Sequence, residues 1–371
     1  MKKINILHTE WSTGWGGQEM RILSESLALR DTYGAKVLLA TRDGAVLGQK
    51  ASEAGLEVAY FGFKNSLDIR SAYGIAKLAK KHEIDIINTH SGKDTWIGWM
   101  ASILSGAKFV RTRHIGNKIS SHPLNFVNKR ADFIITTGEQ IRQNFIDFNG
   151  ILPSKIKSIP TGIDTRIFEP NKYDKNKVRD ELGIPRSAVC VGSMGLFREV
   201  KRLDIFLNIA LSIHKTHPNT HFLLVGSGDT ESFVRDFISM QEMSEFVTLL
   251  PFSSEPAKML SAMDIFMLTS SSEGVPQTLM QALFMQKACI ATNVGSVRDL
   301  FFKDNFLLCD CDENQLKSAL KLLLEHPQML ENLSWDKQEF VRANFSLEKM
   351  ASDVYSVYKE ILGEKNEASH F

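Results

Sequence analysis

Two separate series of short apolar segments, each alternating with amphipathic helix patterns, constrain the fold of this chain more than any other feature. In the first series, I-N-I-L-H, A-K-V-L-L-A, D-I-I-N-T-H, K-F-V-R-T-R and D-F-I-I-T-T alternate with helical patterns such as Gln18–Arg30 and Asp68–Lys81. The second series begins near Ala188 with A-V-C-V-G-S-M-G and continues through H-F-L-L-V-G, F-V-T-L-L, D-I-F-M-L-T and A-C-I-A-T. Strands that alternate with helices form βαβ units, so the sequence predicts an α/β protein with two parallel sheets.

The domain organisation follows from these two series. The 371 residues, of which 43% are hydrophobic, are enough for two domains of ordinary size. We expect an N-terminal domain over residues 1–162, a polar connector over 163–187, a second domain over 188–346, and a closing helix with a tail over 347–371. Ligands of such folds bind at the carboxyl ends of the strands, so we expect the functional site in the crevice between the domains.

The segment S-S-S-E-G-V-P-Q-T-L-M-Q-A-L, residues 270–283, places the carboxylate of Glu273 before a predicted helix. Pro276 has a fixed φ and lacks an N–H, which suits the first turn of a helix that continues over Gln277–Phe284. The free N–H groups at a helix start favour a phosphate, and a carboxylate nearby is suited to the hydroxyls of an attached sugar. The motif thus indicates a nucleotide-sugar site. Alternatively, Glu273 only supports the helix start, and the motif by itself fits both interpretations.

Six further landmarks accompany this motif in a characteristic order. The landmarks are G-W-G-G-Q-E at 14–19, a strand that ends at His114, T-G-I-D-T-R-I-F-E-P at 161–170, Arg198 with Lys201, V-G-S-G-D at 225–229, and N-F-S at 344–346. The chain resembles the family 4 retaining glycosyltransferases, in which two Rossmann-like domains face each other across a cleft (the GT-B architecture). The resemblance covers nearly the whole chain and implies that the last helix, Glu348–Leu362, crosses back onto the N-terminal domain.

The resemblance also assigns residues of the second domain. The family signature is E-x7-E, but here the second position is Gln281, which gives up a charge-assisted hydrogen bond to the nucleotide ribose. Lys201 and Arg198 are expected to neutralise the diphosphate leaving group, although the family spacing is R-x4-K and this chain has R-x-x-K. For Arg198, a solvated helix face is the alternative. The expected donor-binding residues are Gly16, Gly17, Gly226, Gly274, Val275, Pro276, Gln277 and Gln281.

Candidate residues also follow strands of the first domain. Gly16 and Gly17 lie where residues without a Cβ let the backbone approach a phosphate or sugar, unless they only form a tight turn. The spacing is not G-x-G-x-x-G, because the third position is Glu19, which disfavours a nicotinamide cofactor. The resemblance implies that His114 contacts the donor sugar near the reacting carbon; a structural histidine is the alternative. His90 is a second candidate. Arg111, Arg113 and Lys118 are expected to bind an acidic acceptor.

Metal and disulfide chemistry find little support in the sequence. The four cysteines show no CxxC pair and no histidine at zinc spacing, so reduced and mostly buried thiols are expected. The triplet D-C-D at 310–312 has the form of a metal-binding D-x-D, but Asp312 is better placed as the N-cap of a helix over Glu313–Leu324. We therefore expect no metal and no cofactor, with the nucleotide sugar as donor substrate.

Charge is distributed unevenly along the chain. Residues 1–160 carry 22 Lys and Arg against 14 Asp and Glu, whereas the remainder has 22 against 29. A basic N-terminal domain suits an anionic acceptor or an anionic membrane surface; a scattered, solvated charge distribution is the alternative. No apolar stretch is long enough for a signal peptide or a membrane span. We expect a cytoplasmic protein that binds no nucleic acid, with peripheral contact to the inner face of the cytoplasmic membrane as an option.

The expected function is transfer of a sugar from a nucleotide-diphosphate sugar to a bacterial surface glycan, such as lipopolysaccharide core, O-antigen or capsule. No pair of carboxylates flanks an evident reaction centre. The resemblance implies retention of configuration by a front-face route, in which the leaving phosphate helps to deprotonate the acceptor. Two alternatives stay open. One is a sugar-nucleotide epimerase or a phosphorylase of the same architecture, and the other is a partner subunit that binds nucleotide sugar without catalysis, as Gln281 and the R-x-x-K spacing suggest.

Overall fold

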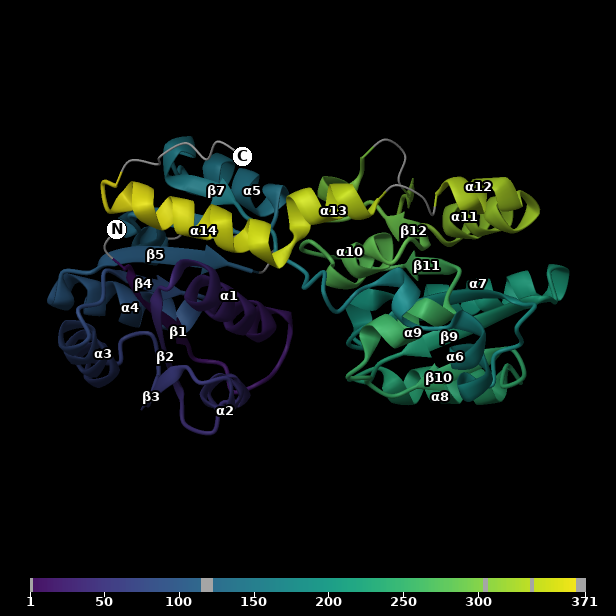
Figure 1. Ribbon diagram of the computed structural model, residues 1–371, viewed down its shortest axis with the longest axis horizontal. Helices are drawn as coiled ribbons and strands as arrows, with labels where there is room; N and C mark the ends of the chain where they lie inside the picture. Colours follow the sequence, from purple (N-terminus) through teal and green to yellow (C-terminus); the bar gives the residue numbers. More distant parts are fainter. Residues whose placement is uncertain (1–2, 115–122, 303–305, 334–336, 365–371) are drawn as a thin grey trace. The chain divides into compact units, whose positions relative to one another are not determined.

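The computed structural model describes residues 3–114, 123–302, 306–333 and 337–364. The chain forms two compact units, each with its own parallel sheet (Figure 1). Unit 1 comprises Met1–Gly162 and Leu347–Phe371, and unit 2 comprises Ile163–Ser346. The prediction of an α/β protein with two parallel sheets is confirmed.

Unit 1 is built on a seven-stranded sheet in the order β3-β2-β1-β4-β5-β6-β7. All neighbouring strands in it are parallel, with residues such as His8 and Asn88 directly paired between β1 and β4. The strands are β1 (Asn5–Glu10), β2 (Lys36–Arg42), β3 (Glu57–Phe61), β4 (Ile86–Thr89), β5 (Lys108–Arg113), β6 (Phe133–Thr136) and β7 (Ile156–Ser158).

The helices of unit 1 bury one face each against this sheet. They are α1 (Gly17–Tyr33), α2 (Val46–Glu53), α3 (Ile69–Lys81), α4 (Gly92–Ser105), α5 (Glu139–Asn149) and α14 (Leu347–Ile361). As the sequence indicates, α3 begins directly after Asp68, whose side chain accepts a hydrogen bond from Ser71 N at 3.2 Å. Residues of α1 and α14 share one apolar cluster with Ile6 and Ile86, whereas α3 and α4 cover the opposite face with Leu7 and Ile87.

The closing helix α14 packs along α1 and so belongs to unit 1 (Figure 1, yellow). Its Tyr355 stacks on Tyr33 of α1, with ring centroids 4.2 Å apart. Its fully buried Tyr358 accepts a hydrogen bond from Asn88 Nδ2 of β4 at 2.9 Å. The expectation that the last helix returns to the N-terminal domain is therefore confirmed.

Unit 2 is built on a six-stranded parallel sheet in the order β10-β9-β8-β11-β12-β13. Its strands are β8 (Val189–Met194), β9 (Thr220–Val225), β10 (Val247–Leu250), β11 (Ile265–Leu268), β12 (Ala288–Thr292) and β13 (Leu307–Cys309). Its helices are α6 (Lys175–Leu182), α7 (Leu203–Thr216), α8 (Glu231–Met240), α9 (Pro256–Ala262), α10 (Gln277–Phe284), α11 (Glu313–Glu325), α12 (Pro327–Asn332) and α13 (Gln338–Phe345).

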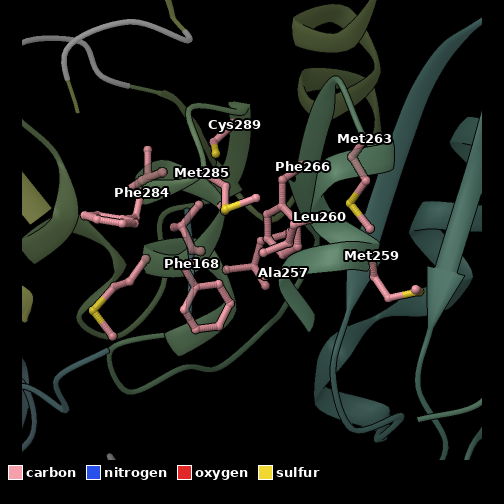
Figure 2. Close-up of a cluster of buried hydrophobic side chains, with 14 of the residues drawn as sticks. Phe168, Ala257, Met259, Leu260, Met263, Phe266, Phe284, Met285 and Cys289 are labelled. Atoms are coloured by element: carbon pink, nitrogen blue, oxygen red, sulfur yellow. The ribbon is translucent and has the colours of Figure 1, made fainter. Parts of the chain in front are cut away.

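Two apolar clusters cover the two faces of this second sheet. One of them joins α6, α9, α10 and α13, and Figure 2 shows Phe168, Leu260, Phe266 and Met285 gathered in it. The segment 163–187, expected as a connector, contributes Phe168, Val178 of α6 and other buried residues to this cluster. It is thus part of unit 2, because its apolar residues are spaced among the polar ones that dominate its composition.

The strand order reverses once in each sheet, between β1 and β4 in unit 1 and between β8 and β11 in unit 2. At such a point the neighbouring helices diverge to opposite faces, and the carboxyl ends of the two strands border a depression suited to ligands. None of the described helices combines the length and the apolar character that crossing a bilayer would require.

Removal of the Tyr358 hydroxyl tests how firmly α14 is attached. In Tyr358→Phe, the buried Nδ2 of Asn88 loses its acceptor, so we expect the free energy of unfolding of unit 1 to fall by about 1–3 kcal/mol. Urea unfolding followed by circular dichroism measures the change. The matched control is Tyr73→Phe, since the Tyr73 side chain is 66% exposed and should lose almost nothing. Equal stability of the two variants would contradict the assigned hydrogen bond.

Candidate functional site

A cluster of polar residues in unit 2, formed by Lys201, Thr269, Ser270 and Glu273, lies at the carboxyl ends of β8 and β11, where the strand order reverses. The segment that follows β8 and the segment that follows β11 together line a small pocket, to which Ser193, Gly195, Lys201, Thr269 and Ser270 contribute. This is the place at which a doubly wound sheet binds its ligand.

Glu273 and Lys201, 72 residues apart in sequence, form an ion pair in this cluster. The Nζ of Lys201 donates to Glu273 Oε1 at 2.6 Å, and Ser270 Oγ donates to the same oxygen at 2.5 Å. The Glu273 side chain is 10% exposed and that of Lys201 is 24% exposed. Because largely buried charges must remain paired, each of the two can leave the other only for a ligand that offers an equivalent partner.

Backbone contacts between the two segments hold this pair in place. Thr269 Oγ1 donates to the carbonyl oxygens of Lys201 at 2.8 Å and Arg202 at 3.1 Å. Ser271 N donates to Val200 O at 2.8 Å. Arg202 adopts a left-handed conformation with φ 49° and is followed directly by α7, while its guanidinium pairs with Asp204. The position of Lys201 is therefore set by the backbone as well as by its own side chain.

Arg198 lies in the same segment but differs from Lys201 in its exposure. Its carbonyl oxygen accepts a hydrogen bond from Lys201 N at 2.9 Å, and its side chain is exposed to solvent. It offers an exposed cation three residues before the paired lysine. Its assignment to the diphosphate stays a prediction.

The helix predicted over Gln277–Phe284 is present as α10. Pro276 is its N-cap rather than a residue of its first turn, with φ −73° and ψ 113°, because the fixed φ of proline suits an extended residue as well as a helical one. Val275 is buried in the apolar cluster, so its side chain fixes the loop and a ligand could reach its backbone alone. Gln277 and Gln281 are half-buried and lie one turn apart on one face of α10.

Glycines allow three loops of unit 2 to pack against one another. A Cβ on Gly226, at φ 157°, would lie 1.9 Å from Gly195 O, and one on Gly228, at φ 150°, would lie 2.4 Å from Phe197 O. A Cβ on Gly295, at φ 54°, would lie 1.8 Å from Glu273 O. The first two glycines therefore let the loop after β9 approach the loop after β8. Gly295 lets the loop after β12 support the backbone of Glu273.

The polar cluster of unit 1 includes a ladder of three histidines. His8 Nδ1 and His90 Nε2 are 2.8 Å apart, and His90 Nδ1 and His114 Nε2 are 3.0 Å apart. His8 and His90 are each 1% exposed, whereas His114 is half-buried. Burial and the charge of Arg21 lower the pKa of His8 to about 3. Burial also lowers the pKa values of His90 and His114 well below the usual range, so all three rings are neutral at neutral pH.

Two buried carboxyl groups lie beside this ladder. Asp94 accepts hydrogen bonds from His90 N, Ser91 N, Ser91 Oγ and Thr9 Oγ1 at 2.6–2.9 Å, which fixes the turn between β4 and α4. Glu10, the last residue of β1, accepts from Ser12 N at 2.8 Å and from Gln18 Nε2. Burial, and then the charge of Asp94, raises the pKa of Glu10 to about 8. Burial therefore favours the protonated form of Glu10.

The arginines predicted to bind an acceptor are less accessible than the sequence suggests. Arg111 is 2% exposed, and its Nη1 donates to Ser91 O at 3.0 Å, so it supports the turn that carries Asp94. Burial and the charge of Arg113 lower the pKa of Arg111 to about 10. Arg113 is half-buried, and Lys118 lies outside the described residues. The assignment of Arg111 to the acceptor stays a prediction, and the burial of its side chain follows from its place on β5, where alternate residues face the helices that cover the sheet.

The glycine-rich segment G-W-G-G precedes α1 directly. Gly16 is the N-cap of α1, and its N–H donates to Glu19 Oε2 at 2.9 Å, while Gly17 is exposed. Both observations fit a tight strand-to-helix turn as well as a ligand contact. The structure also places Asp312 as the predicted N-cap of α11, accepting from Gln315 N at 2.9 Å. In the described part of the chain, no group of three or more His, Cys, Asp or Glu residues is arranged to hold a metal.

The sequence interpretation missed His8, Glu10 and Asp94. His8 and Glu10 belong to L-H-T-E at the end of the first strand, where polar residues at alternate positions indicate one polar side of a buried strand end. Asp94 completes S-G-K-D, a capping pattern of serine with an acidic residue three positions later. Both signals were available, but neither indicates that the three histidines meet.

The contact between Gly295 and Glu273 yields a stability test. In Gly295→Ala, the added Cβ would overlap Glu273 O, and the backbone must also keep φ 54°, so we expect a loss of roughly 3 kcal/mol or more. The matched control is Gly44→Ala, whose φ is 73° but whose Cβ would have no neighbour within 4 Å, and which should lose about 1 kcal/mol. Thermal unfolding compares the two. Similar losses would mean that Gly295 does not support Glu273.

Comparison with known proteins gives two family models that match in succession. The model described as Glycosyltransferase Family 4 matches residues 15–167, and the model described as Glycosyl transferases group 1 matches residues 174–339. The UDP-Gal:α-D-GlcNAc-diphosphoundecaprenol α-1,3-galactosyltransferase of Escherichia coli is 25% identical over 321 residues, 80% of this chain and 81% of the relative. The N-acetyl-α-D-glucosaminyl L-malate synthase of Bacillus anthracis is 24% identical over 308 residues, 80% of each chain.

Solved structures share the same fold. A glycosyltransferase of Rickettsia africae superposes with a TM-score of 0.87 at 19% identity, covering 98% of this chain and all of the other. The HepE protein of Anabaena, solved with UDP and glucose, superposes with a TM-score of 0.82 at 18% identity, covering 96% of this chain and all of the other. With two Rossmann-like units and both family models matched in order over most of its length, the chain belongs to the family 4 glycosyltransferases of the GT-B fold.

Proposed function

We propose that this glycosyltransferase moves a sugar, with retention of anomeric configuration, from a nucleotide-diphosphate sugar to a bacterial surface glycan. The observation that carries the proposal is the largely buried Glu273–Lys201 pair, held by Ser270 beside the start of α10. A carboxylate and an ammonium so placed match two neighbouring parts of the donor, the sugar hydroxyls and the diphosphate.

In this proposal, the bound donor separates the ion pair between Lys201 and Glu273 and gives each side chain a partner of its own. The diphosphate takes the ammonium of Lys201, and the exposed Arg198 supplies a second cation. Glu273 then accepts hydrogen bonds from sugar hydroxyls while Ser270 still donates to it. As the glycosyl bond breaks, negative charge grows on the leaving diphosphate, where Lys201 stabilises it more strongly than in the ground state.

Retention is proposed to follow a front-face route in which the leaving phosphate helps to deprotonate the acceptor hydroxyl. At the carboxyl ends of β8 and β11, Glu273 already accepts hydrogen bonds from Lys201 and Ser270. A carboxylate with these partners is better suited to bind the sugar than to act as a nucleophile. A double displacement would need two carboxyl groups about 5 Å apart around the sugar. The protein would then contribute positioning and charge stabilisation, without a metal.

The choice of donor and acceptor rests on the relatives. A structural neighbour is solved with UDP and glucose, which supports a UDP-sugar as donor. The Escherichia coli relative is named for an acceptor linked to diphosphoundecaprenol, and a Bacillus subtilis relative for teichuronic acid biosynthesis. We propose a surface-glycan acceptor carried on an anionic lipid, which would bring the enzyme to the inner face of the cytoplasmic membrane.

Glu273→Gln tests the proposed site. The neutral amide preserves the shape of the side chain but removes the charge that binds the sugar hydroxyls, so we expect kcat to fall about 10²-fold or more. Glu231→Gln is the matched control, because Glu231 forms an exposed ion pair with Arg235 on α8. Release of nucleotide from a UDP-sugar in the presence of acceptor measures turnover. Turnover of Glu273→Gln equal to that of the control would refute the assignment.

The donor is identified by thermal unfolding of the protein with UDP-, GDP-, ADP- and CMP-sugars, since a ligand that binds the native state raises its stability. We expect a rise in Tm with UDP-sugars, and a smaller rise in Lys201→Met. Treatment with EDTA should leave both the Tm shift and the turnover unchanged. Binding without turnover across a panel of acceptors would favour a partner subunit that does not catalyse, and loss of turnover with EDTA would contradict metal independence.

A further inference from the structure

The three histidines of unit 1 form a diagonal ladder that follows from strand register. His8 of β1 pairs directly with Asn88 of β4, and Asn88 pairs directly with Val110 of β5. His90 lies two residues beyond Asn88, and His114 lies two residues beyond the position level with His90. Each step therefore moves one strand across and two residues towards the carboxyl end, and all three rings project on the face covered by α1 and α14. The ladder connects the buried interior to the edge of the sheet.

Neutral rings allow this ladder two arrangements of protons. A neutral imidazole has one N–H and one lone pair, and His90 uses both of its nitrogens for its neighbours. In the outward arrangement, His8 Nδ1–H donates to His90 Nε2, and His90 Nδ1–H donates to His114 Nε2. In the inward arrangement, every bond is reversed. The proton positions of the three rings are thus coupled, so the nitrogen that carries the proton in His8 determines the nitrogen that carries it in His114.

The environment of His8 favours the outward arrangement. Its Nε2 is buried and has no hydrogen-bond partner among the described residues. In the inward arrangement this atom would be a buried N–H without an acceptor, which folded proteins rarely tolerate. The outward arrangement leaves a lone pair there instead. The charge of Arg21 also acts on His8 and disfavours a positive charge on the ring.

We infer that His90, with His8 behind it, is a positioning residue that fixes His114 in the form carrying its proton on Nδ1, so that the ring presents a hydrogen-bond donor to an oxygen of the sugar substrate. The inference rests on the proposed function and adds to it one expectation from the sequence, the contact between His114 and the donor sugar. The ladder uses Nε2 of His114, and among the residues that the structure describes this leaves Nδ1 available to a ligand. An isolated histidine in water favours the opposite form, with its proton on Nε2, so the ladder changes what His114 offers.

The neutral state of the ladder is maintained by the groups around it. Burial is the largest effect on all three rings, and the charges of Arg21, Arg111 and Arg113 add to it. A neutral Nδ1–H donates to a sugar or phosphate oxygen without transferring its proton at neutral pH. His114 is accordingly assigned a binding contact that orients the sugar, and not the role of a general acid.

The proton positions are measured directly by long-range ¹H–¹⁵N NMR on protein labelled with ¹⁵N-histidine, without substrate. The chain has ten histidines, and the variants His114→Ala and His90→Leu identify the two signals of interest. We expect His90 and His114 both to carry the proton on Nδ1 between about pH 6.5 and 8. A proton on Nε2 of His114 in the wild-type protein would overturn the inference.

Substitution of His90 separates positioning from simple packing. Leucine and asparagine have the same branching, but the amide of asparagine can donate to His114 from the place of Nδ1. In His90→Leu we expect His114 to revert to the Nε2–H form and kcat to fall about tenfold, the effect of one misplaced hydrogen bond. In His90→Asn we expect the Nδ1–H form to persist and a smaller loss of kcat. The same form of His114 in both variants, or equal losses of kcat, would overturn the role of His90.

The experiment distinguishes failure of this inference from failure of the proposed function. The NMR measurement needs no donor or acceptor, so it decides the proton positions even for a protein without turnover. Turnover of His114→Ala equal to that of the wild type would refute the contact with the sugar, and with it the proposed purpose of the ladder, although the proton positions would stand. Thermal unfolding of each variant shows that a loss of kcat is not a loss of fold.

Discussion

The carboxyl ends of parallel strands meet at a single edge of each sheet, and the strand order reverses at one place along that edge. This constraint brings together Lys201 and Glu273, which follow β8 and β11, although 72 residues separate them. It also brings together His8 and His90 at the corresponding place between β1 and β4. The helices on the two faces bury these residues from the sides, so the polar groups are held firmly at the edge where such sheets bind ligands.

Burial imposes a condition on every polar group at this edge. An unpaired charge would cost several kcal/mol, so the charges that remain are paired and other groups are neutral. Glu273 is paired with Lys201, and Asp94 receives four hydrogen bonds. Glu10 and the histidines meet the same condition by shifts of pKa in opposite directions, since burial disfavours the charged form of either type. Pairing and neutralisation both avoid the free-energy cost of a buried, unpaired charge.

The sequence was sufficient for the fold and for part of the site. Sequence patterns predicted both sheets, and they placed the starts of helices α3 and α10 to within one residue, because those signals are local. Glu273 and Lys201 were each identified from their motifs, but their direct contact was not, since it depends on which strands are neighbours. The histidine ladder depends on register across three strands, and the burial of Arg111 depends on which side of the sheet this residue faces. Local patterns do not contain that information.

The two polar clusters differ in how they would meet a donor. In unit 2, Lys201 and Glu273 are already largely desolvated in the free protein. When a diphosphate binds Lys201, the lysine exchanges one anionic partner for another. No buried charge is then left unpaired, provided that sugar hydroxyls donate hydrogen bonds to Glu273. A nucleotide without its sugar would leave Glu273 with Ser270 alone. The proposed arrangement therefore favours the intact donor over the nucleotide product.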